Sequence, residues 1–447
     1  METVYAYDAD GNISSMETKA GENVLLSFAY EYDGNGNRTA KTGRQSGAVL
    51  GGITAGNNAL DISYSYDIHG QLLEEYRNGT STKYTYDKAG NRIKKTDAQG
   101  EIRYFYNAKN QLLREEAEDA EKQFTYDRQG GIIKETNPSG IRRFGYDSRH
   151  RQTKVETENG IVQENRYDSE NLRFELLENG KRTRFIYHDG ELLHEEGGKE
   201  NRQIGYHLGA GIEAFTRVEE TYYYQQDEQL STAFITGRNG VVHNSYQYDA
   251  FGNELETAGQ LPNRVRYTGQ QYDDATGQYY LRARYYNPVF GRFMQEDTYQ
   301  GDGLNLYAYC KNNPVTYYDP SGYDTQVIIC GSTGNFAEGI NDKEPDLYHY
   351  TNAKNAEAIQ KSGMIIPDVR GRVFVTTDKI SPQDANNALF IGTRNANSAT
   401  HRVEITLKDP YDSSLSIEGA TQQNELIYRG TIRNGRNATI IVKENDF

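Results

Sequence analysis

Short runs in which apolar and polar residues alternate occupy the first three quarters of the chain. Lys83-Tyr84-Thr85-Tyr86 is one such run, and Gln71-Leu72-Leu73-Glu74-Glu75-Tyr76 is another. Alternation with a period of two is typical of strands that bury one face. Gly-Asn pairs between the runs supply residues that accept positive φ, as tight hairpin turns require. The pattern predicts a succession of β-hairpins.

These hairpins form a repeat in which Tyr-Asp precedes each Gly- or Asn-containing turn. The copies are Tyr7-Asp8, Tyr32-Asp33, Tyr66-Asp67, Tyr86-Asp87, Tyr126-Asp127, Tyr146-Asp147, Tyr167-Asp168 and Tyr248-Asp249, with degenerate copies at Tyr106-Asn107 and Tyr187-His188. From Tyr66 to Tyr187 the steps are 20, 20, 20, 20, 21 and 20 residues. Such a step suits a two-stranded unit and is too short for a pair of helices. Since one hairpin is marginally stable alone, we expect neighbours to join a continuous, curling sheet.

The tyrosine content differs sharply between two parts of the chain, which indicates two different kinds of domain. Of 37 tyrosines, 33 precede Asp324 and 4 follow it, and the chain has no Trp. Hydrophobic residues make up 36%, below the roughly 45–50% usual for globular chains. Tyrosine therefore supplies much of the apolar surface of the repeats, and a buried tyrosine needs a partner for its hydroxyl.

Charge and cysteine content exclude several classes of protein. The net charge is −15, so the basic excess of a phosphate-backbone binder is missing, although an enzyme can act on nucleic acid without one. Cys310 and Cys330 could pair, but two cysteines cannot hold a fold of this size together. No apolar stretch is long enough to span a membrane, and residues 1–7 lack a signal peptide and open inside a repeat unit. We therefore expect a fragment, or the C-terminal end of a larger protein.

The Tyr-Asp copies resemble the YD repeats of the Rhs family, which includes the C components of insecticidal toxin complexes. Residues 265–323 are similar to the Rhs-associated core, through Gly277-Gln278-Tyr279-Tyr280-Leu281-Arg282-Ala283-Arg284-Tyr285-Tyr286-Asn287-Pro288 and Asp319-Pro320-Ser321-Gly322. The resemblance implies a mainly β protein with three parts. These are a hollow YD-repeat shell of β-hairpins at 1–264, a core that closes it at 265–323, and a variable effector at 324–447.

In the Rhs family the chain cuts itself just after this core, and two aspartates carry out the reaction. Asp297 and Asp319 lie 22 residues apart, and Asp319 opens the family's Asp-Pro-x-Gly motif. When two carboxyl groups are held close together, one keeps a proton and can act as the acid, while the other is ionised and can activate water as the base. The resemblance implies an aspartic autoprotease that cuts between Tyr323 and Asp324.

The sequence departs from the family pattern at two places. Asp297 is followed by Thr298-Tyr299-Gln300 instead of Pro-x-Gly, and Tyr323 stands before the expected cut, where Leu or Met is usual. Both departures bear on how efficiently the chain is cut. By spacing alone, the two aspartates could also simply cap turns.

Residues 324–447 show a different pattern. Residues up to about 346 suit a linker or an N-terminal arm. Strands are predicted at 346–351, 364–367, 372–377, 402–407, 424–430 and 438–442, with an amphipathic helix at 353–362 that Gly363 closes. One helix among strands predicts a small α+β domain. No spacing of Cys and His suits a metal, and neither a phosphate loop nor a Gly-x-Ser-x-Gly elbow is present.

Three short motifs in this segment resemble ADP-ribosyltransferases of the His-Tyr-Glu/Asp class. They are Leu347-Tyr348-His349-Tyr350-Thr351, the strand that contains Phe374, and Asn424-Glu425-Leu426-Ile427-Tyr428. The resemblance covers about residues 345–445. It implies NAD as the substrate and no metal.

The resemblance also implies a role for each candidate residue. His349 would hydrogen-bond the ribose on the adenosine side of NAD, with Thr351 as a second hydroxyl contact. Phe374 stands where the family has a tyrosine that stacks on nicotinamide, and Tyr350 is a second candidate. Glu425 would hold the other ribose and stabilise the oxocarbenium-like transition state. If the acid is an aspartate, the candidates are Asp409 and Asp412.

Three functions remain open from the sequence. The first is a secreted or system-delivered toxin that ADP-ribosylates a macromolecule in the cytoplasm of a competing or host cell, with a cognate immunity protein in the producer. The second is a nuclease or other catalytic toxin on the same carrier, with His349, Arg402 and Glu425 cleaving RNA. The third is a YD-repeat surface protein whose C-terminus only binds a partner.

Overall fold

The structure is a computed structural model, and it forms two compact units, Met1–Asn335 and Phe336–Phe447. In the first unit it describes residues 1–48, 54–188, 190–198, 202–209, 211–298, 305–323 and 325–327. In the second unit it describes the backbone of eight strands.

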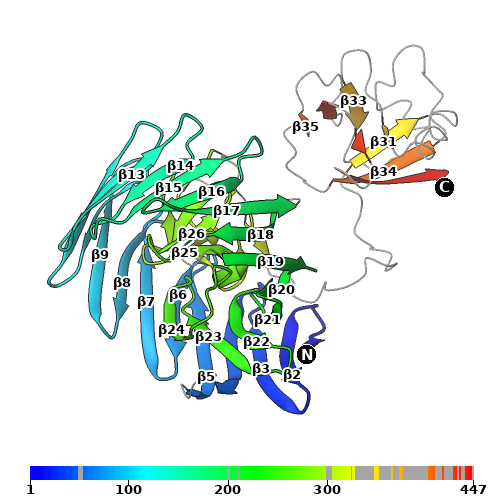
Figure 1. Cartoon of the computed structure of the whole chain (residues 1–447). Coiled ribbons are helices and arrows are strands. Elements are labelled where there is room, and N and C mark those ends of the chain that lie inside the picture. Colours follow the sequence, from blue (N-terminus) through cyan, green and yellow to red (C-terminus); the bar gives the residue numbers. More distant parts are fainter. Residues whose placement is uncertain are drawn as a thin grey trace. The chain divides into compact units, whose positions relative to one another are not determined.

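A single antiparallel sheet of 24 strands dominates the first unit. Each strand pairs with the next one along the chain, and the sheet curls as it proceeds (Figure 1). The strands are β1 (Glu2–Tyr7), β2 (Ile13–Ala20), β3 (Asn23–Tyr32), β4 (Arg38–Ala48), β5 (Thr54–Tyr66), β6 (Leu72–Arg77), β7 (Thr80–Tyr86), β8 (Arg92–Asp97), β9 (Gly100–Tyr106), β10 (Leu112–Glu116), β11 (Glu121–Tyr126), β12 (Ile132–Asn137), β13 (Gly140–Tyr146), β14 (Gln152–Glu156), β15 (Val162–Tyr167), β16 (Arg173–Glu178), β17 (Lys181–His188), β18 (Glu191–Gly197), β19 (Arg202–Leu208), β20 (Ile212–Arg217), β21 (Glu220–Gln226), β22 (Thr232–Gly237), β23 (Val242–Tyr248) and β24 (Glu254–Gly259). The predicted hairpin repeat is confirmed.

The aspartate of each repeat closes its turn. In the turn after β5, Asp67 Oδ1 accepts hydrogen bonds from the amides of His69 and Gln71, both at 2.9 Å. Gly70 takes a φ of 80°, which favours glycine at this position. Asp33, Asp87, Asp127, Asp147, Asp168, Asp227 and Asp249 accept the same pair of amide bonds.

In most repeats the tyrosine ties one hairpin to the hairpin before it. A one-residue bulge follows each Tyr-Asp turn, as where Tyr146 pairs with Gln152 and Gly145 with Lys154. The Tyr146 hydroxyl donates to the carbonyl of Ile132, 3.0 Å away, beside the bulge of the preceding turn. Tyr106 bonds Arg92 and Tyr187 bonds Arg173 in the same way. Because bulges bend a strand and increase its twist, this periodic bulge accounts for the curl.

Removing one such hydroxyl should weaken the sheet measurably. In Tyr146→Phe the ring stays, but the Ile132 carbonyl loses its donor, so we expect a loss of about 1 kcal/mol in the free energy of unfolding. Urea titration followed by circular dichroism measures it. Tyr76→Phe is the matched control, because the Tyr76 side chain is 43% exposed. An equal loss in both variants would contradict this role of the hydroxyl.

An inner layer rich in tyrosine lies within the curve of the sheet (Figure 1). Tyr279, Tyr280, Tyr285 and Tyr286 are each at most 1% exposed, and Tyr286 donates to the carbonyl of Phe251 at 2.6 Å. The elements of this layer are η1 (Tyr267–Gly269), β25 (Gln271–Asp273), β26 (Gln278–Leu281), β27 (Arg284–Asn287), β28 (Arg292–Phe293), η2 (Cys310–Asn312), β29 (Tyr317–Tyr318) and β30 (Gln326–Val327). Tyr279 and Tyr280 also have backbone partners, whereas the Tyr285 hydroxyl contacts the side chains of Tyr167 and Arg173.

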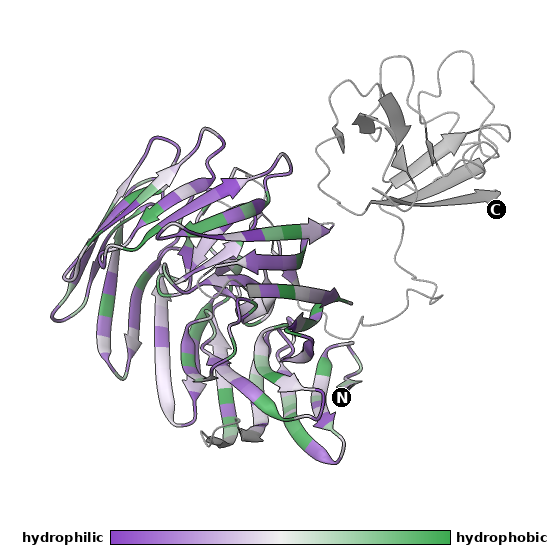
Figure 2. Ribbon diagram, viewed as in Figure 1, coloured by the Kyte–Doolittle hydropathy of each residue, from purple (hydrophilic) through white to green (hydrophobic). Residues whose placement is uncertain are grey.

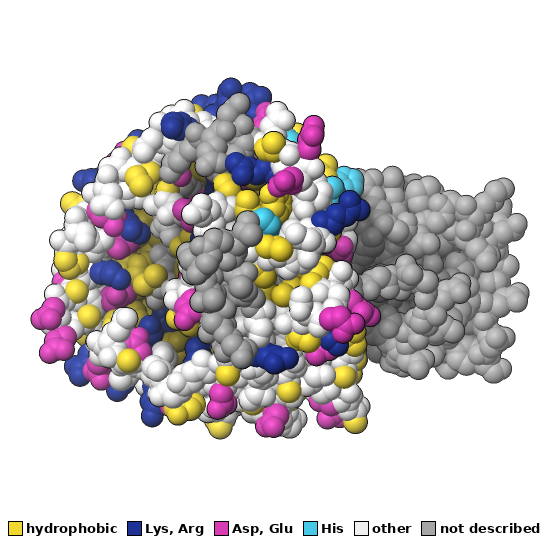
Figure 3. Space-filling view, turned by 60° about the horizontal axis from the view of Figure 1, so that its bottom comes forward, with side chains coloured by type: hydrophobic (Ala, Val, Ile, Leu, Met, Phe, Trp, Pro, Cys, Tyr) yellow, Lys and Arg dark blue, Asp and Glu magenta, His cyan; other side chains and the backbone are white. Residues whose placement is uncertain are grey.

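The surface of the first unit agrees with the sequence pattern. Hydrophilic and hydrophobic positions alternate along many of the strands (Figure 2). Acidic and basic side chains are interspersed on the face shown in Figure 3. Among the residues that the structure describes, no helix is long and apolar enough to cross a membrane.

The second unit contains strands at the predicted places. They are β31 (Leu347–Thr351), β32 (Met364–Ile365), β33 (Arg372–Val375), β34 (His401–Leu407), β35 (Leu415–Ser416), β36 (Leu426–Arg429), β37 (Ile432–Arg433) and β38 (Ala438–Glu444). β34 pairs with β31 and β38, and β36 pairs with β33 and β35. The helix predicted at 353–362 lies outside the described residues.

Candidate functional site

Asp297 and Asp319 meet at one guanidinium group, that of Arg284. Arg284 opens β27, Asp297 follows β28, and Asp319 follows β29. Arg284 Nη2 lies 2.8 Å from Asp297 Oδ2 and 3.6 Å from Asp319 Oδ2. Both aspartates are buried, at 7% and 2% exposure. The predicted pair of carboxylates is therefore assembled in space.

The Asp-Pro-x-Gly motif forms a turn that fixes Asp319. Its Oδ1 accepts the amides of Ser321 at 3.0 Å and Gly322 at 2.7 Å. Gly322 has a φ of 76°, and a Cβ built on it would lie 2.5 Å from the carbonyl oxygen of Leu281 and 2.9 Å from the amide nitrogen of Arg284. Both neighbours are backbone atoms that cannot move aside. The motif therefore needs glycine here for conformational and steric reasons.

Arg284 also holds the chain just before the expected cut. Its Nε donates to the carbonyl of Gly322, and its Nη1 donates to that of Leu306 at 3.2 Å. Tyr323 follows Gly322 directly and is 45% exposed. The guanidinium thus contacts both carboxylates and the residue preceding Tyr323.

The flanks of the Tyr323 segment are paired in a short antiparallel ladder. Tyr317 and Tyr318 of β29 pair with Val327 and Gln326 of β30. Tyr323 therefore lies in the connection between two paired strands. Such a connection is more accessible than a strand inside a sheet.

The surroundings of Asp319 make it easier to protonate than an ordinary aspartate. Burial raises the pKa of Asp319 to about 6, and the charge of Asp297 adds to the rise, while Arg284 and the two amides oppose it. Asp297 has the shorter ion pair with Arg284, which favours its carboxylate form. The arrangement can supply an acid and a base from two adjacent carboxyl groups.

Arg284 is the residue that sequence reasoning did not single out. It lies within the quoted core motif, but nothing in its spacing distinguishes it from Arg282. Of the residues that depart from the family pattern, Thr298 and Tyr323 are described, whereas Tyr299 and Gln300 lie outside the described residues. Among the cysteines, Cys310 is buried, and Cys330 lies outside the described residues.

The candidates for NAD binding lie on strands whose backbone alone is described. His349, Tyr350 and Thr351 belong to β31, and Phe374 belongs to β33. These two strands are neighbours. Arg402, which the nuclease alternative uses, belongs to β34, the partner of β31. Glu425, Asp409 and Asp412 lie outside the described residues.

Comparisons with known proteins relate mainly to the repeat region. The family model of the teneurin YD-shell matches residues 49–315. The tRNA3(Ser)-specific nuclease WapA of Bacillus spizizenii is 34% identical over 177 residues, which are 37% of this chain and 8% of that protein. The toxin protein Tse5 of Pseudomonas aeruginosa is 41% identical over 69 residues, 15% of this chain and 5% of Tse5.

Among solved structures, the crystal structure of TcdB2-TccC3-TEV matches with a TM-score of 0.39 and 17% identity. The match covers 72% of this chain and 20% of that one. The chain thus spans only a small part of the length of these three proteins.

Proposed function

Because the chain belongs to the teneurin YD-shell family, we propose that residues 1–323 are a toxin carrier that cuts itself after Tyr323 and so separates residues 324–447 as the effector. The observation that carries the proposal is the meeting of Asp297, Asp319 and Arg284 beside the carbonyl of Gly322. Three polar side chains are brought together from the start of β27 and the segments after β28 and β29, and Asp319 lies four residues before Tyr323.

The proposed reaction is hydrolysis of the peptide bond between Tyr323 and Asp324. Asp297, as the carboxylate, takes a proton from a water molecule that attacks the carbonyl carbon of Tyr323. Asp319 gives its proton to the departing amide nitrogen of Asp324. Arg284 is a positioning residue, because it orients both carboxyl groups and holds the preceding carbonyl. Removing any of the three groups should therefore slow the reaction.

The proposal predicts that cleavage is faster in mild acid. Asp319 acts in its protonated form and has a pKa raised to about 6 by burial. The rate constant should therefore rise about tenfold for each unit of pH from 8 down to 6, and level off below. Arg284→Lys, which we expect to cleave slowly enough to be purified intact, gives the rates after transfer to each pH. A rate that is flat, or that rises with pH, would exclude Asp319 as the acid.

For the effector we propose transfer of ADP-ribose from NAD to a macromolecule of the target cell. Its support is the set of motifs around His349, Phe374 and Glu425 in a segment that follows a YD-shell core. We further propose that the protein is secreted or delivered by a secretion system, and that the producing cell holds a cognate immunity protein. Similarity to the toxin protein Tse5 of Pseudomonas aeruginosa supports a role as a toxin.

A nuclease is the second candidate, because the relatives include a tRNA3(Ser)-specific nuclease. One experiment separates the two activities. The full chain is incubated with labelled NAD and cell lysate, and, in parallel, with total tRNA without NAD. Label transfer that Glu425→Ala abolishes and Glu418→Ala retains supports the transferase. Degradation of tRNA without label transfer supports the nuclease, and the absence of both leaves a binding protein.

A further inference from the structure

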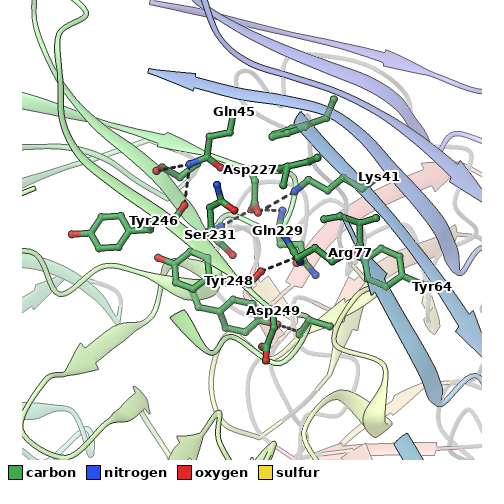
Figure 4. Close-up of a pocket in the computed structure, with 17 residues that line it drawn as sticks. Lys41, Gln45, Tyr64, Arg77, Asp227, Gln229, Ser231, Tyr246, Tyr248 and Asp249 are labelled. Carbon is green, nitrogen blue, oxygen red and sulfur yellow. Dashed lines mark hydrogen bonds and ion pairs between the residues drawn. The ribbon is translucent and has the colours of Figure 1, made fainter. Parts of the chain in front are cut away.

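The turn between β21 and β22, residues 227–231, differs from the aspartate turns that carry an asparagine. In the turns of Asp33 and Asp249, the asparagine four residues later donates its side-chain amide to Oδ2, at 2.9 and 2.8 Å. The residue at this place after Asp227 is Ser231. Instead, Lys41 Nζ from β4 lies 3.4 Å from Asp227 Oδ2 (Figure 4). An amine therefore faces this carboxyl group, although the two residues are far apart in the sequence.

The lysine and the aspartate are largely buried, with side chains that are 10% and 15% exposed. The Lys41 Nζ lies 4.4 Å from the centre of the Phe28 ring. Glu228, which is fully buried, accepts from the same Nζ with Oε2 at 2.8 Å. Burial raises the pKa of Asp227. Charges placed here cost solvation energy, so a reaction that removes two of them is favoured.

The carboxyl group of Asp227 is polarised for attack. Its Oδ1 accepts the amides of Gln229 and Ser231, both at 2.9 Å. Two backbone donors on one oxygen are the arrangement that stabilises the oxyanion of an acyl-transfer intermediate. The other oxygen, Oδ2, is the one that faces Lys41.

We propose that Lys41 and Asp227 join in an intramolecular amide bond. The Nζ lone pair attacks Cγ of Asp227, and negative charge gathers on Oδ1 against the two amides. One proton passes from Nζ to Oδ2, 3.4 Å away, before the attack and a second after it; the Cγ–Oδ2 bond then breaks, and water leaves. Of the three hydrogens of the ammonium group, one stays on the amide nitrogen and two leave with Oδ2. No oxidant or other reactant is needed.

The site has room for the product water. A cavity of about 40 Å³ adjoins the pair, and Lys41, Asp227, Gln229 and Ser231 are among the residues that line it (Figure 4). A polar cavity needs roughly 10–15 Å³ of such space to hold a water molecule. The fold supplies the proximity, which in well-oriented intramolecular reactions corresponds to effective concentrations of about 10⁵ M or more.

The bond would join the beginning of the sheet to its end. Lys41 lies in β4, and Asp227 directly follows β21. The two regions already share an apolar cluster, in which Leu26, Phe28 and Ile62 pack with Phe234. A covalent link between them would close a loop of most of the sheet and reduce the entropy of the unfolded chain.

Intact-mass spectrometry of the denatured full chain tests the proposal, followed by tryptic mapping. The species that contains residues 41 and 227 should be lighter than its sequence by one water, and trypsin should yield one branched peptide joining the two segments. Lys41→Arg should restore the full mass, and Asp227→Asn should lose ammonia instead of water. Lys19→Arg is the control, because Lys19 pairs with Glu17 on the surface, and it should keep the water loss.

The branched peptide is the decisive product, because dehydration of an aspartate elsewhere gives the same mass without a branch. If Lys41→Arg fails to fold, the near-isosteric Asp227→Asn variant still tests the proposal, because its mass should fall by one ammonia. The proposal would be overturned if trypsin cuts after Lys41 in the chain without substitutions and residues 41 and 227 appear only in separate, unbranched peptides. The test is independent of self-cleavage, since both residues precede Tyr323.

Discussion

Replacing Asp319 with asparagine should leave the chain in one piece. The amide has the shape of the carboxyl group, and its oxygen can still accept the amides of Ser321 and Gly322. The turn is therefore kept, while the proton that Asp319 would give to the leaving nitrogen is lost. General acid catalysis contributes about 10²–10⁴-fold, so the rate of cleavage should fall by at least that factor. A denaturing gel of freshly synthesised protein, sampled over time, measures the fall.

The matched control for this variant is Asp168→Asn. Asp168 also accepts two backbone amides in a turn, those of Glu170 and Leu172, both at 2.9 Å. The control should be cut at the unmodified rate. Equal melting temperatures of Asp319→Asn and Asp168→Asn would show that folding is not the cause of the difference. Cleavage of Asp319→Asn at the normal rate would remove Asp319 from the reaction.

The largest expected effect on stability comes from Asp273→Asn. Asp273 is 1% exposed and forms an ion pair with Arg173, which is fully buried. Its oxygens also accept Gln163 at 2.9 Å and Arg264 at 3.3 Å. Arg173 begins β16 of the large sheet, whereas Asp273 ends β25 of the inner layer. The pair therefore joins the two layers.

Neutralising Asp273 leaves the buried Arg173 guanidinium without its counter-charge, while Arg264 keeps its ion pair with Glu195. Breaking a buried pair in this way costs about 3–5 kcal/mol, and a loss of that size in the free energy of unfolding should appear in urea titration. Asp274→Asn is the neighbouring control. The Asp274 side chain is 68% exposed and pairs with Arg266, so its loss should cost about 0–1 kcal/mol. Similar losses in the two variants would show that the layers are not joined by this pair.

The repeat could be predicted from the sequence because its determinants are local. Turn glycines such as Gly36 and Gly90 adopt the positive φ that their position indicates. The alternating runs become strands for the same reason, since a period of two needs no knowledge of distant neighbours. The partner of each tyrosine hydroxyl was not predictable. Tyr146 reaches Ile132 only because a bulge sets the register between two hairpins.

The candidate site also contains residues that the sequence predicts and residues that only the fold identifies. Asp297 and Asp319 were found through their motif and spacing, but Arg284 enters only when β27 is placed beside the ends of β28 and β29. The turn at Asp227 carries Gln226 in place of the repeat's tyrosine, so a search for Tyr-Asp pairs does not identify it. Its meeting with Lys41 depends on the curl of the sheet, which no local pattern encodes. The roles proposed for His349, Phe374 and Glu425 stay predictions.

The most direct test of self-cleavage is the intact mass of the unmodified chain, with the N-terminal residue of each fragment. Two fragments are predicted, residues 1–323 and residues 324–447, and the second should begin with Asp324. The bond between Asp319 and Pro320 is of a kind that breaks in acid, and a fragment that begins with Pro320 would reveal such an artefact. A single species with the mass of all 447 residues would contradict the claim that this carrier cuts its own chain.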